Sequence, residues 1–434
     1  MKHKSRLFGS TLATFKQASI AVFAAIVMLA APVASNAQDT TSSIRGKIFD
    51  QGGTPLAGAT VVVEDTRSGV ERTYSTNNGG VFLATRLLPG GPYRVTVNGT
   101  KSVDIASIGL GDTYGLTVSM QQEAAIEEII TIGQTADLVE VASGPAATFS
   151  IDDIDSSVAF SRDIADVYEI DPRLMVDNDE DGFGLNCAGK HPRLNNVTLD
   201  GVSMTDRFGL NENGYSTAVG MPFPFDAVET VAVELAPFDV NYGGFSACNI
   251  NAVTKSGTND WDAKVFYEFS NNDLRGDTVP DDTRDYGRAS YDKTYIGFNA
   301  AGPIIKDKLF FFAAYSESET PRFLQRGYAG SGNGEERDWL SQADYDRINN
   351  IAQSVYGYDP GGQPGDGLQE DEKYLVRVDW NINDDHNAAV IYSYYDGYQL
   401  RDSDGDQDEF EFANHFYTKG AENTAYTVKL NSQW

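Results

Sequence analysis

Three segments in the C-terminal part of the chain alternate between apolar and polar residues. They are WDAKVFYEF (261–269), KYLVRVDW (373–380) and TAYTVKLNSQW (424–434). A period of two residues predicts β-strands with one apolar and one polar face. Transmembrane β-barrels have such strands, about ten residues long, with a lipid face, a polar lumen and aromatic residues near the membrane interfaces. A soluble β-sandwich would show the same alternation, so the period alone does not separate the two.

The lengths of the connections favour the barrel. We expect six strands, over 261–270, 291–301, 308–317, 373–381, 387–396 and 424–434. The connections between them alternate: 271–290, 318–372 and 397–423 are long, and 302–307 and 382–386 are short. Outer-membrane barrels join their strands by short periplasmic turns and long extracellular loops. The long connections are also acidic and rich in glycine, as exposed loops are, so we predict a transmembrane barrel.

The chain before the barrel divides into two further zones. Over 40–121, strand-like segments recur about every ten residues between glycine-rich turns, which predicts a small β-sandwich. Over 122–258 the pattern is mixed, with a helix expected between the N-cap candidate Ser161 and Pro172, followed by strand–turn units. One of these units, LNNVTLDGVSMTD (194–206), predicts a short strand that ends in a tight turn at Asp200-Gly201.

The first 37 residues have the features of a secretory signal peptide. An apolar stretch, IAVFAAIVMLAAPV (20–33), is followed by the small residues Ser35-Asn36-Ala37 and preceded by Lys2, Lys4, Arg6 and Lys16. The apolar stretch is shorter than the roughly 20 residues that a membrane-spanning helix needs. We therefore expect the chain to be exported, and any membrane role to depend on β-strands or a surface contact.

Composition and charge narrow the class of function. The chain has 434 residues and a formal net charge of −30 at pH 7. This acidic balance argues against nucleic-acid binding, which needs clustered lysine and arginine. The sequence has no zinc-protease, nucleophile-elbow, P-loop or dinucleotide-binding motif, and the spacing of His191, His386 and His415 suits no metal site. We expect neither an enzyme nor a bound cofactor.

The order of the zones and four motifs within them resemble the TonB-dependent receptors of the outer membrane. GKIFDQGGTPLAGATVVVED and NNGGVFLATRLLPGGPYRVTV are similar to the carboxypeptidase regulatory-like family, whose domains are transthyretin-like β-sandwiches. PRLNNVTLDGVSMTDRFG is similar to the plug-domain motif of the receptors, and INAVTKSGTNDW to the segment in which the plug passes into the first barrel strand. A regulatory-like sandwich before the plug is typical of the Oar-like branch.

The resemblance implies a mainly β protein with four parts. These are a signal peptide (1–37), a carboxypeptidase regulatory-like β-sandwich (40–121), a TonB-box region with an α+β plug domain (122–258), and the first strands of an incomplete transmembrane β-barrel (259–434). In such receptors a plug inside the barrel blocks passive flow, and an extracellular substrate binds to the loops and the plug apex. TonB, driven by the ExbB–ExbD motor, then pairs with a short box near the plug.

The implied function is plug-gated uptake of a bulky substrate through the outer membrane of a Gram-negative bacterium. The alternative is an Oar-like structural or adhesion protein without active import. The sequence does not identify the extracellular substrate, and peptides, glycans and metal chelates stay open. Further partners implied are outer-membrane lipid and the barrel-assembly machinery, for which a terminal aromatic residue such as Trp434 can act as a signal.

The resemblance also assigns roles to particular residues. The plug motif holds Asn195, Asn196, Asp200 and Gly201, which would fill the pore rather than do chemistry. The TonB contact is expected at Glu128, Ile129, Ile130, Thr131 and Ile132, and a linker strand is the alternative interpretation of that segment.

Six strands are too few to close a receptor barrel. Barrels of this class have about 22 strands. An open edge in lipid leaves backbone groups without hydrogen bonds, at a cost of several kcal/mol for each group. We therefore expect the sequence to be the N-terminal part of a longer receptor.

Cysteines and acidic runs give the remaining candidate sites. Cys187 and Cys248 lie in the plug zone of an exported chain, where a disulfide is expected rather than a metal pair. Asp177, Asp179 and Asp181 in DNDEDG (177–182) are spaced as at the start of a calcium loop. However, Ala188 stands where an EF-hand has its last acidic ligand, so we interpret this run as a solvated turn.

A second acidic run, DSDGDQDE (402–409), falls in a predicted extracellular loop. It could hold calcium or bind a cationic substrate, but we expect it simply to repel its neighbours.

Overall fold

The computed structural model describes residues 40–434 except 121–145, 150–161, 163–170, 180–181, 207, 209–210, 212, 236–242, 272, 275–291, 323, 384–385, 404–407 and 433–434. The expected signal peptide, the expected TonB box over 128–132 and the helix expected after Ser161 lie outside the described residues. The described part of the chain is mainly β, as the sequence predicts.

The first part is a β-sandwich made of the sheets β4-β1-β7 and β3-β2-β5-β6. Its strands are β1 (Ser42–Phe49), β2 (Thr60–Asp65), β3 (Val70–Ser75), β4 (Val81–Leu87), β5 (Tyr93–Val97), β6 (Lys101–Ile105) and β7 (Thr113–Ser119). Alternate residues such as Ile44, Val61, Val63 and Val95 lie in one buried core between the sheets. This is the arrangement that a period of two predicts. The strands recur about every ten residues between turns, as the sequence predicts.

A second sheet, of order β12-β11-β14-β13-β8, forms what we call the plug sheet. Its strands are β8 (Ala146–Phe149), β11 (Asn196–Leu199), β12 (Val202–Ser203), β13 (Val228–Leu235) and β14 (Cys248–Thr254). The hairpin expected at Asp200-Gly201 is present, and both residues have positive φ, 53° and 82°, as a type I′ turn requires. A separate hairpin is formed by β9 (Leu174–Asp179) and β10 (Gly182–Cys187).

The third part is an antiparallel sheet of six long strands, which we call the barrel sheet. Its strands, in order, are β15 (Asp262–Asn271), β16 (Asp292–Ile305), β17 (Leu309–Arg322), β20 (Gly367–Asn383), β21 (His386–Arg401) and β22 (Tyr417–Ser432). All six expected strands are confirmed, and most extend further towards the long connections than expected. The strands are longer because their backbone hydrogen bonds to the neighbouring strand continue beyond the point at which the outward-facing residues become polar.

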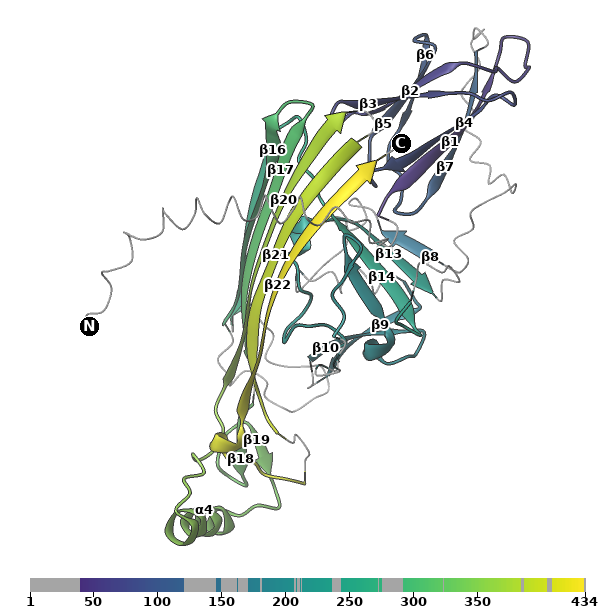
Figure 1. Cartoon of the computed structure of the whole chain (residues 1–434). Helices are drawn as coiled ribbons and strands as arrows, with labels where there is room; N and C mark the ends of the chain where they lie inside the picture. Colours follow the sequence, from purple (N-terminus) through teal and green to yellow (C-terminus); the bar gives the residue numbers. More distant parts are fainter. Residues whose placement is uncertain are drawn as a thin grey trace, which may run out of the picture. The chain divides into compact units, whose positions relative to one another are not determined.

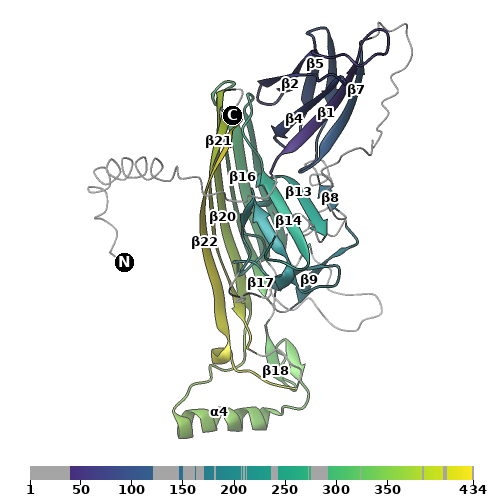
Figure 2. The ribbon, with the colours of Figure 1, turned by 45° about the vertical axis from the view of Figure 1, so that its right-hand side comes forward.

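The two faces of the barrel sheet have different surroundings. Inward-facing residues such as Phe312, Leu375 and Ile391 share one buried core with Val197 and Ile250 of the plug sheet. Outward-facing residues are apolar and exposed, among them Val265, Tyr267, Phe298, Val390, Tyr426 and Val428. Figures 1 and 2 show the long strands side by side, with β13 and β14 against one face. An apolar outer face and a covered inner face match a barrel wall with lipid outside and a plug inside.

The outer face carries an aromatic row beside an acidic row. Phe298, Tyr315, Tyr374 and Tyr394 lie directly opposite one another on four neighbouring strands, with ring centroids 5.5, 5.0 and 5.6 Å apart. One step towards the long connections lies a row of carboxylates, again in register: Glu317, Glu372, Asp396 and Glu422. The apolar surface therefore ends at an aromatic girdle, as it does in outer-membrane barrels.

The long connection between β17 and β20 contains structure that the sequence analysis did not expect. It holds β18 (Arg326–Tyr328), β19 (Glu335–Arg337) and the helix α4 (Gln342–Tyr356). The Ser341 hydroxyl accepts a hydrogen bond from the Asp344 N–H at 3.2 Å, and Gly357 ends the helix with a left-handed φ of 64°. None of the helices in the described residues has the length and hydropathy of a membrane-spanning helix.

Candidate functional site

Asp200 lies at the contact between the plug sheet and the barrel sheet. The Asp200 backbone N–H donates to the Ala252 carbonyl at 2.8 Å, which continues the parallel pairing of β11 with β14. The Thr254 hydroxyl donates to the Asp200 carboxylate at 2.7 Å. The Asp200 side chain is only 1% exposed. A buried carboxylate needs opposite charge and hydrogen bonds nearby.

Two cations of the barrel sheet supply that charge. Arg377 Nη1 on β20 lies 3.4 Å from Asp200 Oδ1, and Lys429 Nζ on β22 lies 3.1 Å from it. Arg377 Nη1 also donates to the carbonyl and hydroxyl oxygens of Thr254, at 2.8 and 3.0 Å. Asp379 accepts from Nη2 of the same guanidinium at 2.8 Å. We call these four charged residues, Asp200, Arg377, Asp379 and Lys429, the Asp200 cluster.

The Asp200 cluster is electrically balanced. Burial alone would raise the pKa of Asp200, but Lys429, Arg377 and the Thr254 hydroxyl together hold that pKa below its ordinary value. Asp200 is therefore ionised at neutral pH, and the two carboxylates match the two cations. The removal of Asp200 would leave Lys429 without its carboxylate and Arg377 with Asp379 alone, and breaking a buried pair in this way costs more than the pair contributes as a whole.

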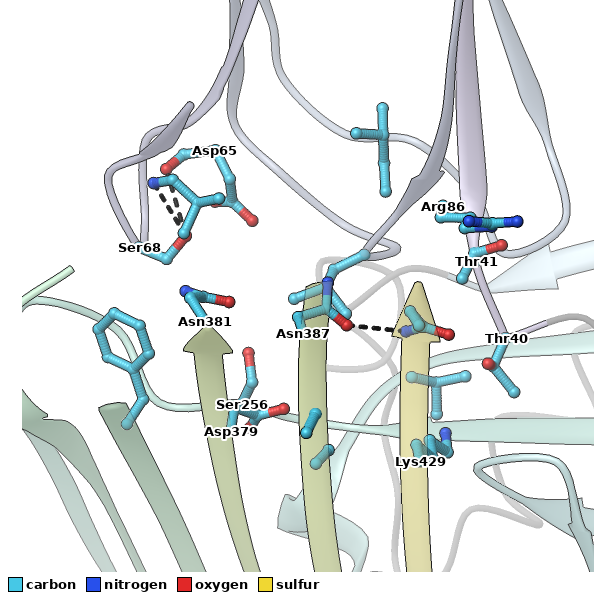
Figure 3. A pocket seen from close by; sticks show the side chains of 18 of the residues that line it. Thr40, Thr41, Asp65, Ser68, Arg86, Ser256, Asp379, Asn381, Asn387 and Lys429 are labelled. Carbon is cyan, nitrogen blue, oxygen red and sulfur yellow. Dashed lines mark hydrogen bonds between the residues drawn. The ribbon is translucent and has the colours of Figure 1, made fainter. Parts of the chain in front are cut away.

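A pocket opens beside the Asp200 cluster. Among the residues that line it are Asp200 and Ser256 at the end of the plug and Asp379, Asn381, Asn387 and Lys429 on the barrel sheet. Figure 3 shows the labelled side chains Asp379, Asn381, Asn387 and Lys429 near the ends of the long strands. The Asn431 amide donates to the Asn387 side-chain oxygen at 3.0 Å. Asp379 and Lys429 are both paired within the cluster, so this pocket opens onto paired charges.

A second ionic contact joins the plug to the barrel sheet, and here the plug supplies the cation and the barrel sheet the carboxylate. The guanidinium of Arg162 lies 2.6 Å from Asp226 in the plug and 2.9 Å from Glu268 on β15. Its Cζ atom lies 4.1 Å from the ring centre of Phe266 and 5.4 Å from that of Tyr295. Rings at these distances stabilise a cation through their negative faces. The plug therefore presents one acid and one base to complementary groups on the barrel sheet.

Uncharged groups on β21 hold the plug as well. The Tyr395 hydroxyl donates to the Val219 carbonyl and accepts from the Val219 N–H, both at 2.8 Å. The Gln399 amide donates to the Ala218 carbonyl at 2.9 Å. Tyr395 and Gln399 are both buried. The backbone of this plug loop is thus fixed to the barrel sheet at a third place.

Two of the plug-motif residues, Asn195 and Asn196, lie at the start of β11, and the other two, Asp200 and Gly201, form the turn at its end. Asn195 donates to the Leu185 carbonyl at 2.6 Å and accepts from the Cys248 N–H at 3.2 Å. Asn196 donates to the Asn249 side chain at 2.9 Å. Both asparagines are buried. Their hydrogen bonds join β10, β11 and β14, so their role is to order the plug.

The two cysteines lie beside these asparagines. Cys187 ends β10 and Cys248 begins β14, and the structure joins them, with Cα atoms 6.0 Å apart. The bridge spans 61 residues of sequence and connects the β9–β10 hairpin to the plug sheet.

Other expected site residues fall outside the described part of the chain. Asp181 and the side chains of Asp177 and Asp179 are among them, as is the whole segment Glu128 to Ile132. Within the described residues, no group of three histidine, cysteine or acidic side chains is arranged to hold a metal ion. Asp402, expected to repel its neighbours, instead forms a buried ion pair of 2.5 Å with Arg326, so that expectation is wrong for this residue. An arginine from the neighbouring connection overrides the local repulsion.

The two long connections pack together into what we call the loop module (324–366 with 408–416). Tyr345 of α4 stacks on Phe412 with ring centroids 5.2 Å apart and meets Phe410 edge-on at 5.6 Å. Arg326 lies between Asp402 and Glu411, both of them buried. Sequence reasoning missed this module, although Ser341, Asp344 and Gly357 are helix-capping signals that could have indicated α4.

Comparisons with known proteins match these parts of the chain. A carboxypeptidase regulatory-like domain matches residues 43–122, and an outer membrane beta barrel domain matches residues 253–323. The chain is 25% identical over 300 residues to the TonB-dependent transporter Oar of Myxococcus xanthus. The alignment covers 64% of this chain and 27% of that protein. The chain thus carries a regulatory-like domain followed by an outer-membrane barrel domain, and it spans about a quarter of this relative's length.

Solved structures with a similar arrangement include outer-membrane transporters and receptors. The outer membrane transporter YddB of Escherichia coli aligns with a TM-score of 0.47 at 11% identity, covering 68% of this chain and 38% of that one. The siderophore receptor PirA of Pseudomonas aeruginosa aligns with a TM-score of 0.37 at 13% identity, covering 67% and 39%.

Proposed function

We propose that the chain is the N-terminal part of an outer-membrane transporter of the TonB-dependent kind, in which the plug closes the barrel until TonB engages it. The observation that carries the proposal is the contact between the plug sheet and the barrel sheet. One buried core continues across it, and ionic pairs of both polarities cross it. A plug fixed at several separate places suits a closed resting state that opens only under an applied force. The similarity to the Oar transporter supports the same kind of function.

The division of the chain belongs to the same proposal. Residues 1–37 would direct export to the outer membrane, 40–121 would form the sandwich, 122–258 the TonB-box region and plug, and 259–434 the first part of the barrel. The edges of the barrel sheet, β15 and β22, would pair with strands that this sequence does not contain.

The TonB contact is proposed at Glu128 to Ile132. The segment is rich in β-branched residues, so it can add as an extended strand to a sheet of TonB through main-chain hydrogen bonds. ExbB and ExbD would supply the energy through TonB. A proline at Ile130 would remove one N–H and disturb the strand.

Disulfide trapping in cells tests this contact. Ile130→Cys in the full receptor should cross-link to cysteines placed in the TonB strand-pairing region, and Ile130→Pro should abolish capture by TonB. Ala136→Pro, outside the proposed box, is the matched control and should leave capture intact. If Ile130→Cys fails to cross-link while the receptor is present in the outer membrane, the transport mechanism is wrong. A structural or adhesion role would then fit better.

A further inference from the structure

The helix α4 leaves most of its apolar side chains uncovered. Tyr345 is buried in the aromatic cluster of the loop module, whereas Ile348, Ile351 and Val355 are 48%, 40% and 69% exposed. These three residues follow one another at helical spacing and so form one stripe. Figure 2 shows α4 beside β18, at the end of the long strands. Tyr356 and Tyr358 extend the exposed apolar surface past the end of the helix.

The surroundings of this stripe are strongly acidic. Residues 335–359 contain six carboxylates and two arginines, and Arg337 is buried beside Glu335. The neighbouring connection, 402–416, contains six carboxylates and no lysine or arginine. Arg347 is therefore the one exposed cation of 335–359, and the field around the stripe is negative.

The charge decides what kind of partner suits the stripe. An anionic membrane surface would be repelled by these carboxylates, and so would a second copy of the same acidic helix. A neutral glycan would gain little from exposed isoleucine and valine. A cationic chain with apolar side chains satisfies both features, because its apolar residues would cover the stripe while its lysines or arginines face the carboxylates.

We propose that the stripe of α4 is the first docking surface for a cationic, amphipathic peptide, which would be the substrate class of the transporter. This inference rests on the proposed function, since it assigns the loop module to capture of the external substrate. It makes Ile348, Ile351 and Val355 the apolar contact and Asp344, one turn before Ile348, the carboxylate at its border.

Binding of defined probe peptides tests the proposal. The full receptor in detergent would be titrated into a fluorescein-labelled helical peptide of leucine and lysine, with empty micelles as the blank, and anisotropy would be recorded. We expect saturable binding that weakens as the ionic strength is raised from about 0.05 to about 0.5 M. A peptide with glutamate in place of lysine, and one with serine in place of leucine, should both fail to bind.

Two sets of variants locate the surface. Ile351→Ser with Val355→Ser should weaken binding about tenfold, because two apolar contacts are lost. Asn350→Ser with Gln353→Ser, on the other side of the helix, is the matched control and should bind like the parent chain. Asp344→Asn keeps the stripe and should weaken binding mainly at low salt.

Each unexpected result would reject one part of the proposal. If the glutamate peptide binds as well as the lysine peptide, the contact is not electrostatic. If the serine variants bind unchanged, the stripe is not the contact. Cross-linking of Ile130→Cys to TonB does not involve α4, so a failure of peptide binding with intact cross-linking rejects this inference alone.

Discussion

Replacing Asp200 by asparagine should destabilise the plug more than any other single isosteric change at the Asp200 cluster. The substitution keeps the shape of the side chain and one acceptor oxygen for Thr254, but it removes the charge that faces Arg377 and Lys429. Breaking a buried pair by removing one partner costs about 3–5 kcal/mol. Lys429 is 18% exposed and can be partly hydrated, so we expect the lower end, about 3 kcal/mol.

Asp379→Asn is the matched control, because Arg377 and Lys429 both keep Asp200 as a partner. We expect a loss of about 1 kcal/mol for this variant, the size of an ordinary hydrogen-bond change. Unfolding of the plug can be followed in the detergent-solubilised protein by a short protease pulse at increasing urea concentration. If Asp200→Asn lowers the free energy of unfolding no more than Asp379→Asn does, the cluster does not hold the plug.

The double variant Asp200→Asn, Arg377→Gln separates a true pair from two independent effects. The effects of residues in one charge network are coupled. We therefore expect the double variant to lose less free energy of unfolding than the two single variants together, by at least about 1 kcal/mol. The pH dependence gives a further check. Since the pKa of Asp200 is lowered in the folded protein, its contribution is complete above its unfolded pKa of about 3.9 and is lost only as the pH falls through the lowered value. Asp200 therefore predicts a flat response between about pH 5 and 8.

Three further predictions follow from contacts elsewhere. Cys187→Ala with Cys248→Ala should cost about 4 kcal/mol of plug stability for a closed loop of this length, and reduction of the parent protein should have the same effect in urea unfolding. If reduction changes nothing, the bridge is not formed. Tyr395→Phe should cost about 1–3 kcal/mol in the same assay, because the backbone groups of Val219 lose their partner; unchanged stability would contradict the contact. Glu372→Gln should raise thermal stability by about 0.2–1 kcal/mol, since like charges lie directly opposite it in the acidic row; a loss would mean that this row is already compensated.

Local sequence patterns predicted the elements of this fold but not the contacts between them. The period of two predicted all six strands of the barrel sheet, and Asp-Gly predicted the turn at Asp200. The same pattern gave no sign that the Asp200 carboxylate would be buried between cations. Its partners Arg377 and Lys429 are 177 and 229 residues away in sequence, and only the packing of two sheets brings them together.

Two errors of prediction have a different origin. The side-chain pattern predicts strand ends near Glu317 and Glu372, where the outward-facing residues become charged, although a strand continues as long as its neighbour pairs with it. The connection between β17 and β20 contains the helix α4, with capping signals at Ser341 and Gly357, where the sequence pattern predicts only an exposed loop. The first error came from too strict a use of side-chain pattern, and the second from expecting extracellular connections to have no helices.

The bridge between Cys187 and Cys248 also limits how far the plug can be drawn out of the barrel. A pull on the chain ahead of β8 would first detach this edge strand from β13 and then extend the residues up to Cys187. Residues 146–187, 42 in all, would reach about 140 Å when fully extended.

Once residues 146–187 are fully extended, the pulling force passes through the disulfide from Cys187 to Cys248. The residues between the two cysteines then carry none of this force. From Cys248 the load enters β14, which is followed within a few residues by β15 of the barrel sheet. The plug would therefore have an extensible N-terminal half and a C-terminal half that remains anchored. If such a pull opened a channel through the barrel, the channel would close again when the extended N-terminal segment refolded onto the anchored half of the plug. The whole plug would not have to refold.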